Sequence, residues 1–130
     1  MQTRKFMLEI DFHVMNEWLD KHGNPMVNAD ELPVSGFAVE DHGAPVCFAF
    51  LRMVEGPIAI AESLVTDPDV PLLTAVRAID TMTEHVFKVA IDRNIKYLFS
   101  TTSSTGVSSH LLKRHGYIKS QQQLLIKKLS

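Results

Sequence analysis

A chain of 130 residues is long enough to bury a core without disulfides or metals, so we expect one domain over residues 1–130. Thirteen basic and 15 acidic residues give a formal charge of −2, which argues against a nucleic acid or an anionic membrane as partner. No stretch approaches the ~18 uninterrupted apolar residues of a membrane span. The single cysteine, Cys47, lies in an apolar run and is expected to be a buried core residue. These features predict a cytoplasmic protein.

The N-terminal region predicts one short strand followed by one short helix. The strand is expected over Arg4–Ile10, where basic and apolar residues are mixed. Asp11 is placed as the helix N-cap, because Val14, Trp18 and Leu19 follow at helical spacing. A Gly-Asn-Pro stop signal then ends the helix, and a polar loop follows.

Three apolar segments separated by short turns predict an antiparallel meander. The segments are Val34–Glu40, Pro45–Val54 and Ile58–Thr66. The middle segment is apolar on both faces, which is typical of a central strand. The sheet must therefore be covered on both sides.

A long amphipathic helix is predicted over Leu72–Asp92. Its apolar residues recur every three or four positions and face a polar stripe. Asp69 is placed to cap this helix, and Pro71 is expected in its first turn, where a missing N–H costs nothing.

The segment after the long helix predicts a right-handed crossover. The strand Ile95–Ser100 should run parallel to the strand that ends at Thr66. A Ser/Thr-rich loop then leads to a short helix over Val107–His115, closed by Gly116. A final extended segment is expected over Tyr117–Leu129.

This order of elements resembles the GNAT superfamily of acetyl-CoA-dependent N-acetyltransferases over Val34–Leu129. The most specific segments are the Leu-Val-Thr-Asp-Pro run leading into the long helix, and Lys-Arg-His-Gly-Tyr near the C-terminus. The Leu-Pro-x-x-Gly segment at Leu32–Gly36 also resembles small GNAT-like proteins carried by bacteriophages, which would place the chain in a host cytoplasm. The resemblance implies a three-layer α/β/α fold of the α+β class. Its mixed, mostly antiparallel sheet would have a central parallel pair splayed into a V and helices on both faces.

The resemblance also implies that acetyl-CoA binds in this V. The pantetheine arm would bond to the strand edge at Leu64, Val65 and Thr66, and the pyrophosphate would lie over the N-terminus of the helix that starts near Val70. Helix N-termini favour anions because their first N–H groups are unpaired. The full set of expected cofactor-binding residues is Leu64, Val65, Thr66, Val70, Leu72, Leu73, Thr74, Ser103 and Thr105. Alternatively, the last two belong only to a solvated loop with a helix N-cap.

Two departures from the family pattern weaken these expectations, the first by predicting weak, atypical or absent CoA binding and the second by removing the usual general acid. The phosphate loop of the family carries glycines, whereas the segment from Asp69 to Ala75 has none. Pro71 removes one N–H donor, and Asp67 and Asp69 place negative charge near the phosphates. The tyrosine that often serves as general acid is replaced by Leu112.

Glu62 is the candidate catalytic residue for acetyl transfer to an amine. The reaction needs a base for the proton of the amine, and Glu62 interrupts an apolar strand two residues before Leu64. Either Glu62 or a water would receive the proton as the amine attacks the thioester. The alternative is that Glu62 pairs with a basic side chain or points to solvent.

The six histidines show no spacing typical of a metal site, so no metal is predicted. The segment from Ser108 to His110 could supply a general acid in place of the missing tyrosine, but the alternative, an inert His110 on an exposed helix face, is favoured.

Two functions remain open. The first is an acyltransferase that moves an acetyl group to an amine of an unidentified small molecule or protein. The second is a catalytically degenerate GNAT-like scaffold that docks on another protein, which the missing glycines favour. The glutamine run at 121–123, beside Leu124, Leu125 and Ile126, also predicts an edge strand that could pair with a second copy in a homodimer.

Overall fold

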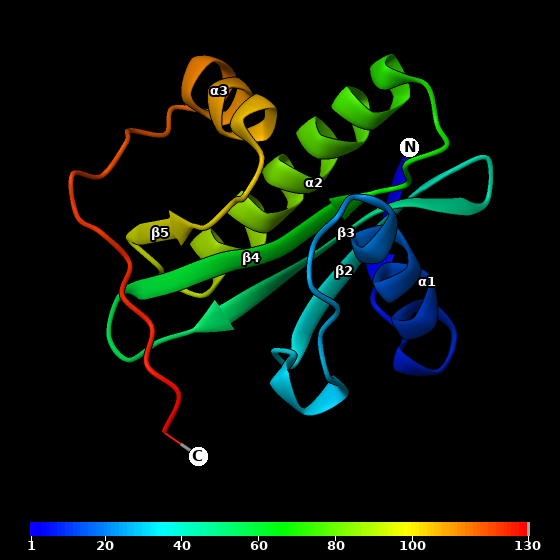
Figure 1. The fold of residues 1–130 in the computed structure, drawn as a ribbon. Helices are drawn as coiled ribbons and strands as arrows, with labels where there is room; N and C mark the ends of the chain where they lie inside the picture. The colour runs from blue at the N-terminus through cyan, green and yellow to red at the C-terminus, as the bar shows by residue number, and fades with distance from the viewer. Residues whose placement is uncertain (130) are drawn as a thin grey trace.

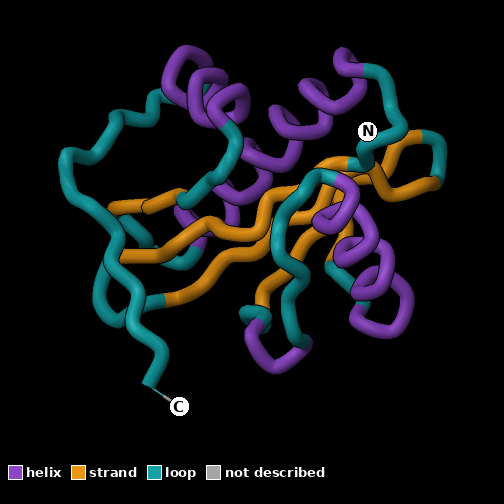
Figure 2. Tube along the Cα trace, in the orientation of Figure 1, coloured by secondary structure: helices purple, strands orange, loops and turns teal. Residues whose placement is uncertain are grey.

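The computed structural model describes residues 1–129 and shows a five-stranded sheet with three α-helices (Figures 1 and 2). The strands lie in the sheet in sequence order, β1-β2-β3-β4-β5. Their bounds are β1 Gln2–Lys5, β2 Ser35–Asp41, β3 Ala44–Met53, β4 Ile58–Thr66 and β5 Tyr97–Ser100. The helices are α1 Leu8–Lys21, α2 Leu72–Asp92 and α3 Thr105–Arg114, with a 3-10 turn at Ala29–Glu31.

The predicted meander and crossover are confirmed. β1 to β4 pair antiparallel in succession, and β5 pairs parallel to β4 after the α2 crossover. β3 is the central strand, and its residues from Cys47 to Leu51 are all buried. Cys47 is fully buried, as predicted, and burial raises the pKa of its thiol.

The two faces of the sheet are covered by different helices, which confirms the predicted three-layer α+β fold. On one face α1 places Trp18 against Phe48 with stacked rings whose centroids are 4.8 Å apart. On the other face α2 buries a stripe spaced at three or four residues, consisting of Ala78, Met82, Val86 and Ala90. α3 lies beside α2 on that same side of the sheet (Figure 1).

The start of α1 differs from its prediction. β1 ends at Lys5 and α1 begins at Leu8, so Asp11 lies inside the helix instead of capping it. Its carboxylate is buried and reaches back to accept a hydrogen bond from the Met7 N–H at 2.8 Å. Arg4 donates two further bonds to Asp11, at 2.7 and 2.9 Å. A sequence pattern of apolar spacing could not reveal this pairing between β1 and α1.

The bounds predicted for α2 are confirmed, but its capping is not. Pro71 is the N-cap residue and no side chain caps the helix. Asp69 instead bonds locally, since its N–H donates to the Asp67 carboxylate at 2.9 Å. Pro71 itself occupies the N-cap position with an extended backbone (φ −57°, ψ 149°), so Asp69 lies two residues before the position from which a side chain would cap the helix.

The C-terminal region differs most from the sequence prediction. The segment after α3 forms no strand up to residue 129, so the expected strand over Tyr117–Leu129 is wrong. The parallel pair consequently lies at one border of the sheet, where β5 is an edge strand with Tyr97 and Phe99 more than half exposed. The prediction failed because β pairing depends on a partner edge, which is not encoded locally. Within residues 1–129, no helix is long and apolar enough to cross a membrane.

Candidate functional site

The parallel strands β4 and β5 separate halfway along β4. Their pairing runs from Ile58 with Tyr97 to Ala61 with Ser100, and the Thr101 N–H donates to the Ala61 carbonyl at 3.3 Å. Beyond that point the two chains part, while β4 stays paired to β3 as far as Thr66. The edge of β4 from Ser63 to Thr66 is therefore not covered by β5.

A bulge in β4 coincides with the separation. Ser63 has a positive φ of 56°, and the register with β3 shifts at this point. Ala61 and Leu64 consequently pack on the same α2-facing side, although residues three apart on a regular strand face opposite sides. Val65 packs with the cluster under α1.

A cleft of about 630 Å³ occupies the space between the separated strands. Of the residues predicted to bind the cofactor, Leu64, Val65, Thr66 and Ser103 line it. The other walls of the cleft are formed by the end of α1, the loop that follows α1, one side chain of α2 and the start of α3. They contain residues that the sequence did not single out, including His22, Asn24, Thr101, Thr102 and Val107.

Two hydrogen bonds cross or occupy the mouth of this cleft. His22, just after α1, donates from Nε2 to the Thr66 carbonyl at 2.8 Å. Ser103 donates from its hydroxyl to the Asn24 side-chain oxygen at 3.2 Å, which joins the loop after α1 to the loop before α3. A ligand that used the Thr66 carbonyl would have to displace His22.

The N-terminus of α2 lies outside the cleft. Among the predicted phosphate-site residues, Leu72 and Leu73 are mostly exposed, and Val70 lies before the helix and not in it. The first helical bond runs from the Ala75 N–H to the Pro71 carbonyl, so the N–H groups of Leu72, Leu73 and Thr74 have no helical acceptor. These three N–H groups, with no side-chain cap, are available to an anion.

A basic residue lies near this helix end. Lys21, the last residue of α1, places Nζ 3.6 Å from an Asp69 carboxylate oxygen. This contact offsets part of the negative charge that Asp69 brings to the region. It could not be found from the sequence, because the two residues are 48 positions apart.

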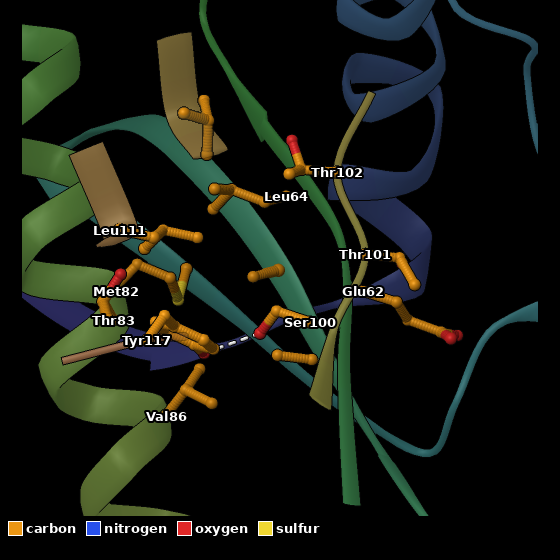
Figure 3. A pocket seen from close by; sticks show the side chains of 13 residues that line it. Glu62, Leu64, Met82, Thr83, Val86, Ser100, Thr101, Thr102, Leu111 and Tyr117 are labelled. Carbon is orange, nitrogen blue, oxygen red and sulfur yellow. Dashed lines mark hydrogen bonds between the residues drawn. The ribbon is translucent and has the colours of Figure 1, made fainter. Parts of the chain in front are cut away.

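A smaller pocket adjoins the cleft on the α2 side, with Leu64, Thr101, Thr102 and Val107 lining both. Its volume is about 40 Å³ (Figure 3). Inside it the Tyr117 hydroxyl lies 2.6 Å from the Ser100 hydroxyl. Burial raises the pKa of Tyr117 despite the bond from Ser100, so the phenol stays protonated at neutral pH. The only sequence signal for Tyr117 was its place in the Lys-Arg-His-Gly-Tyr segment.

Glu62 forms an ion pair with Arg52 across β3 and β4. Arg52 donates from Nε and from one terminal nitrogen to Glu62 Oε1, at 2.9 and 2.6 Å, and also to the Glu31 carbonyl at 2.7 Å. Figure 3 shows the Glu62 side chain extending away from Tyr117 and Leu64. The pairing with a basic side chain, one of the alternatives for Glu62, is thus observed, while Oε2 accepts no hydrogen bond from residues 1–129.

The loop before α3 provides a helix cap. Ser104 is the N-cap of α3 and its hydroxyl accepts from the Val107 N–H at 3.2 Å. Thr105 is the first residue of α3 and does not line the cleft, so only Ser103 of the two predicted loop residues does.

Three residues far apart in sequence meet between α2 and α3. His110 and His115 each place Nε2 2.6 Å from the same oxygen of Asp80, Oδ1. His110 is therefore partly buried and hydrogen-bonded, and does not lie on an exposed helix face as predicted. Burial alone raises the pKa of the Asp80 carboxyl, but the bonds from both histidines bring it below its usual value.

Comparison with known proteins identifies the fold. No protein-family model matches the chain, and no curated protein matches it in sequence. Solved structures do match: Rv2747 from Mycobacterium tuberculosis, in complex with CoA, has a TM-score of 0.70 at 15% identity, covering 97% of this chain and 76% of that chain. A predicted acetyltransferase with acetyl-CoA from Clostridium acetobutylicum has a TM-score of 0.68 at 14% identity, covering 97% and 95%. This chain has the GNAT acetyltransferase fold.

A third match shows the same fold inside a larger protein. N-acetylglutamate synthase from Neisseria gonorrhoeae, complexed with coenzyme A and N-acetyl-glutamate, has a TM-score of 0.64 at 18% identity. The match covers 87% of this chain but 27% of the synthase. At these identities the GNAT likeness establishes the architecture and leaves the chemistry to the residues of this chain.

Proposed function

We propose that this protein is an N-acetyltransferase that moves an acetyl group from acetyl-CoA to an amine of a small molecule or a protein. The observation that carries the proposal is the separation of β4 from β5 beyond Ala61, which leaves a strand edge facing a cleft of about 630 Å³. A free edge offers backbone donors and acceptors to an extended amide chain, as in strand addition. Structures of the same fold contain CoA or acetyl-CoA, which supports this choice of cosubstrate.

The residues around the cleft fit such a cosubstrate in part. Leu64, Val65 and Thr66 would hold the amide-bearing arm along β4, and Ser103 would contact it from the opposite wall. The free N–H groups of Leu72, Leu73 and Thr74 would bind phosphate at the α2 N-terminus, with Lys21 nearby. Val70, which packs against the core, and Thr105, which does not line the cleft, would then not contact the cosubstrate. Because the segment has no glycine, we expect weak binding.

Acetyl-CoA, when bound, supplies the activated acetyl group. The protein must accept one proton from the attacking amine and donate one to the leaving thiolate. Because the Glu62 side chain extends away from Leu64 and Tyr117, a water held near Oε2 would pass the proton of the attacking amine to Glu62. Arg52 would hold the Glu62 carboxylate in a fixed orientation through Oε1. Tyr117, protonated and held by Ser100 in the adjoining pocket, would donate a proton to the leaving group.

Binding is tested by thermal unfolding with acetyl-CoA. At 100 times its dissociation constant, a ligand stabilises the folded state by about 2.7 kcal/mol, which raises Tm measurably. Two matched variants are used. Val107→Trp places an indole ring into the space of both pockets, whereas Leu112→Trp adds the same ring on the same helix at a position that lines neither pocket. We expect wild type and Leu112→Trp to respond, and Val107→Trp not to respond.

Turnover is tested separately, by thiol release from acetyl-CoA with a panel of amines. Glu62→Gln should lower kcat while leaving the acetyl-CoA response in Tm unchanged, whereas Glu55→Gln, in an exposed turn, should change neither. Unchanged kcat in Glu62→Gln would assign the base to water.

The second candidate is a scaffold of this fold that acts by docking on another protein. The bonds of His22 to Thr66 and of Ser103 to Asn24 favour it, because they already satisfy polar groups of the cleft that a cosubstrate would otherwise use. A wild-type protein whose Tm does not move at millimolar acetyl-CoA would support the scaffold. A homodimer, a bacteriophage source and a cytoplasmic location are further expectations. Sedimentation tests the homodimer, and genome context tests the bacteriophage source.

A further inference from the structure

The cluster of Asp80, His110 and His115 lies apart from the residues that would hold acetyl-CoA. Its ligand atoms, Asp80 Oδ1 and Nε2 of both histidines, all lie within 4.8 Å of one another. Asp80 belongs to α2, His110 to α3, and His115 is the C-cap of α3. Contrary to the sequence prediction, the four residues between the two histidines give a spacing that occurs between zinc-binding histidines, and the fold brings Asp80 of α2 to them.

The three side chains of the cluster are partly buried, and solvent can still reach Asp80. The His115 side chain is 9% exposed, His110 22% and Asp80 35%. Phe87 packs near His115 with ring centroids 6.3 Å apart, which gives the site an apolar side. The remaining exposure on the Asp80 side leaves room for a fourth, solvent-derived ligand.

Two imidazole nitrogens and one carboxylate oxygen are ligands that zinc prefers. Zn²⁺ takes histidine nitrogen and carboxylate oxygen at about 2.0 Å in a tetrahedron, so its ligand atoms lie about 3.3 Å apart. The two Nε2–Oδ1 separations of 2.6 Å would have to widen by less than 1 Å, and the two Nε2 atoms, which lie within 4.8 Å of each other, would have to reach the same separation. Calcium and magnesium prefer an all-oxygen set and are disfavoured here.

We propose that Asp80, His110 and His115 bind one Zn²⁺ ion, with water as the fourth ligand. In the metal-free protein each Nε2–H donates to Asp80 Oδ1. On binding, each neutral imidazole moves its proton to Nδ1 and presents the Nε2 lone pair to the metal. The ion joins α3 to α2, and since Val107 of α3 lines both the cleft and the smaller pocket, it also stabilises one wall of the cleft.

The test uses the untagged chain, stripped with chelator and titrated with ZnCl₂ by calorimetry. We expect one zinc per chain and a rise in Tm. His115→Gln and Asp80→Asn should weaken binding by at least roughly tenfold, the loss seen when even an outer-sphere partner is removed. His13→Gln, which removes an exposed histidine on α1, should bind like wild type.

A second measurement needs no variant to fold. Histidine ring NMR signals of the wild type should shift on zinc addition for His110 and His115 and stay unchanged for His13, His22 and His42. The proposal would be overturned by the absence of saturable zinc binding, or by equal NMR shifts of all histidines. The cluster would then serve only to join α3 to α2 by hydrogen bonds. Neither readout involves acetyl-CoA, so the zinc site can fail or stand independently of the proposed acetyl transfer.

Discussion

Helices α1 and α3 are held against the rest of the domain by different interactions. α1 buries three large apolar side chains, Met15, Trp18 and Leu19, against the sheet, and its Asp11 carboxylate is buried with Arg4. α3 buries only Leu111, and its other attachments are the hydrogen bonds of two histidines to Asp80.

The difference shows which wall of the cleft can adapt. Burial of apolar area supplies most of the free energy that holds an element in place, and α1 has much more of it than α3. The cleft therefore lies between a firmly held side, made of β4 and the end of α1, and a weakly held side, made of the β5–α3 loop and α3. Segments with few buried apolar contacts open at low free energy, so we expect ligands to act mainly on α3.

Removing the main apolar anchor of α1 should have the largest effect. Trp18→Ala deletes the ring that stacks on Phe48 and should lower the free energy of unfolding by about 4 kcal/mol. Chemical denaturation measures the change. The control is Ile91→Ala, at an exposed position of α2, which should stay within about 0.5 kcal/mol of wild type. A small loss in Trp18→Ala would show that α1 is not the firmly held helix.

Breaking the buried ion pair of α1 should have the next largest effect. Asp11→Asn leaves Arg4 with only Glu40 as an acidic partner, so we expect a loss of about 3 kcal/mol at neutral pH. Burial opposes ionisation of Asp11, but bonds from Arg4 and the Met7 N–H lower its pKa below its usual value.

The same pair predicts a dependence on pH. Because the pKa of Asp11 is lower in the folded state, its stabilisation is present above its unfolded pKa of about 3.9 and is lost as pH falls through the folded pKa. Unfolding curves at several pH values should therefore converge for wild type and Asp11→Asn in acid. Parallel curves over the whole range would contradict the assignment.

Shortening the single apolar anchor of α3 should cost less and act locally. Leu111→Ala should lower the free energy of unfolding by about 2 kcal/mol, at the low end for leucine, because the site lies near the surface. Hydrogen exchange should accelerate in α3 and stay unchanged in α1. Equal acceleration in both helices would mean that α3 unfolds only with the whole domain.

The smallest effect is expected on α2, at His85. Burial, with a contribution from Lys88, lowers the pKa of His85 below its ordinary 6.5, and its ring packs edge-on against Phe37. The unfolded chain then binds this proton more readily, so stability should fall by less than about 1 kcal/mol as pH drops below 6.5. His85→Gln should flatten that slope in unfolding curves. A slope unchanged by the substitution would point to another titrating group.

The parts of the fold with strong local patterns could be predicted from the sequence. The bounds of α2 and β4 agree with their predictions because apolar spacing and flanking turn residues mark both ends. The cleft edge at Leu64–Thr66 was reached through the resemblance, which supplied the separation of the strands. The tail to residue 129 was mistaken for a strand because alternating apolar residues do not specify a partner edge.

The sequence by itself determined the meander, the long helix and the covering of both faces of the sheet, since hydrophobic periodicity is a local property that can be recognised without the tertiary structure. Only the tertiary structure decided which polar groups meet. Arg52 with Glu62, His22 with Thr66, and Asp80 with two histidines are contacts between segments that approach only after the sheet and helices have packed. Hydrogen bonds and ion pairs require geometry within a few tenths of an ångström, and residue identity alone does not carry that information.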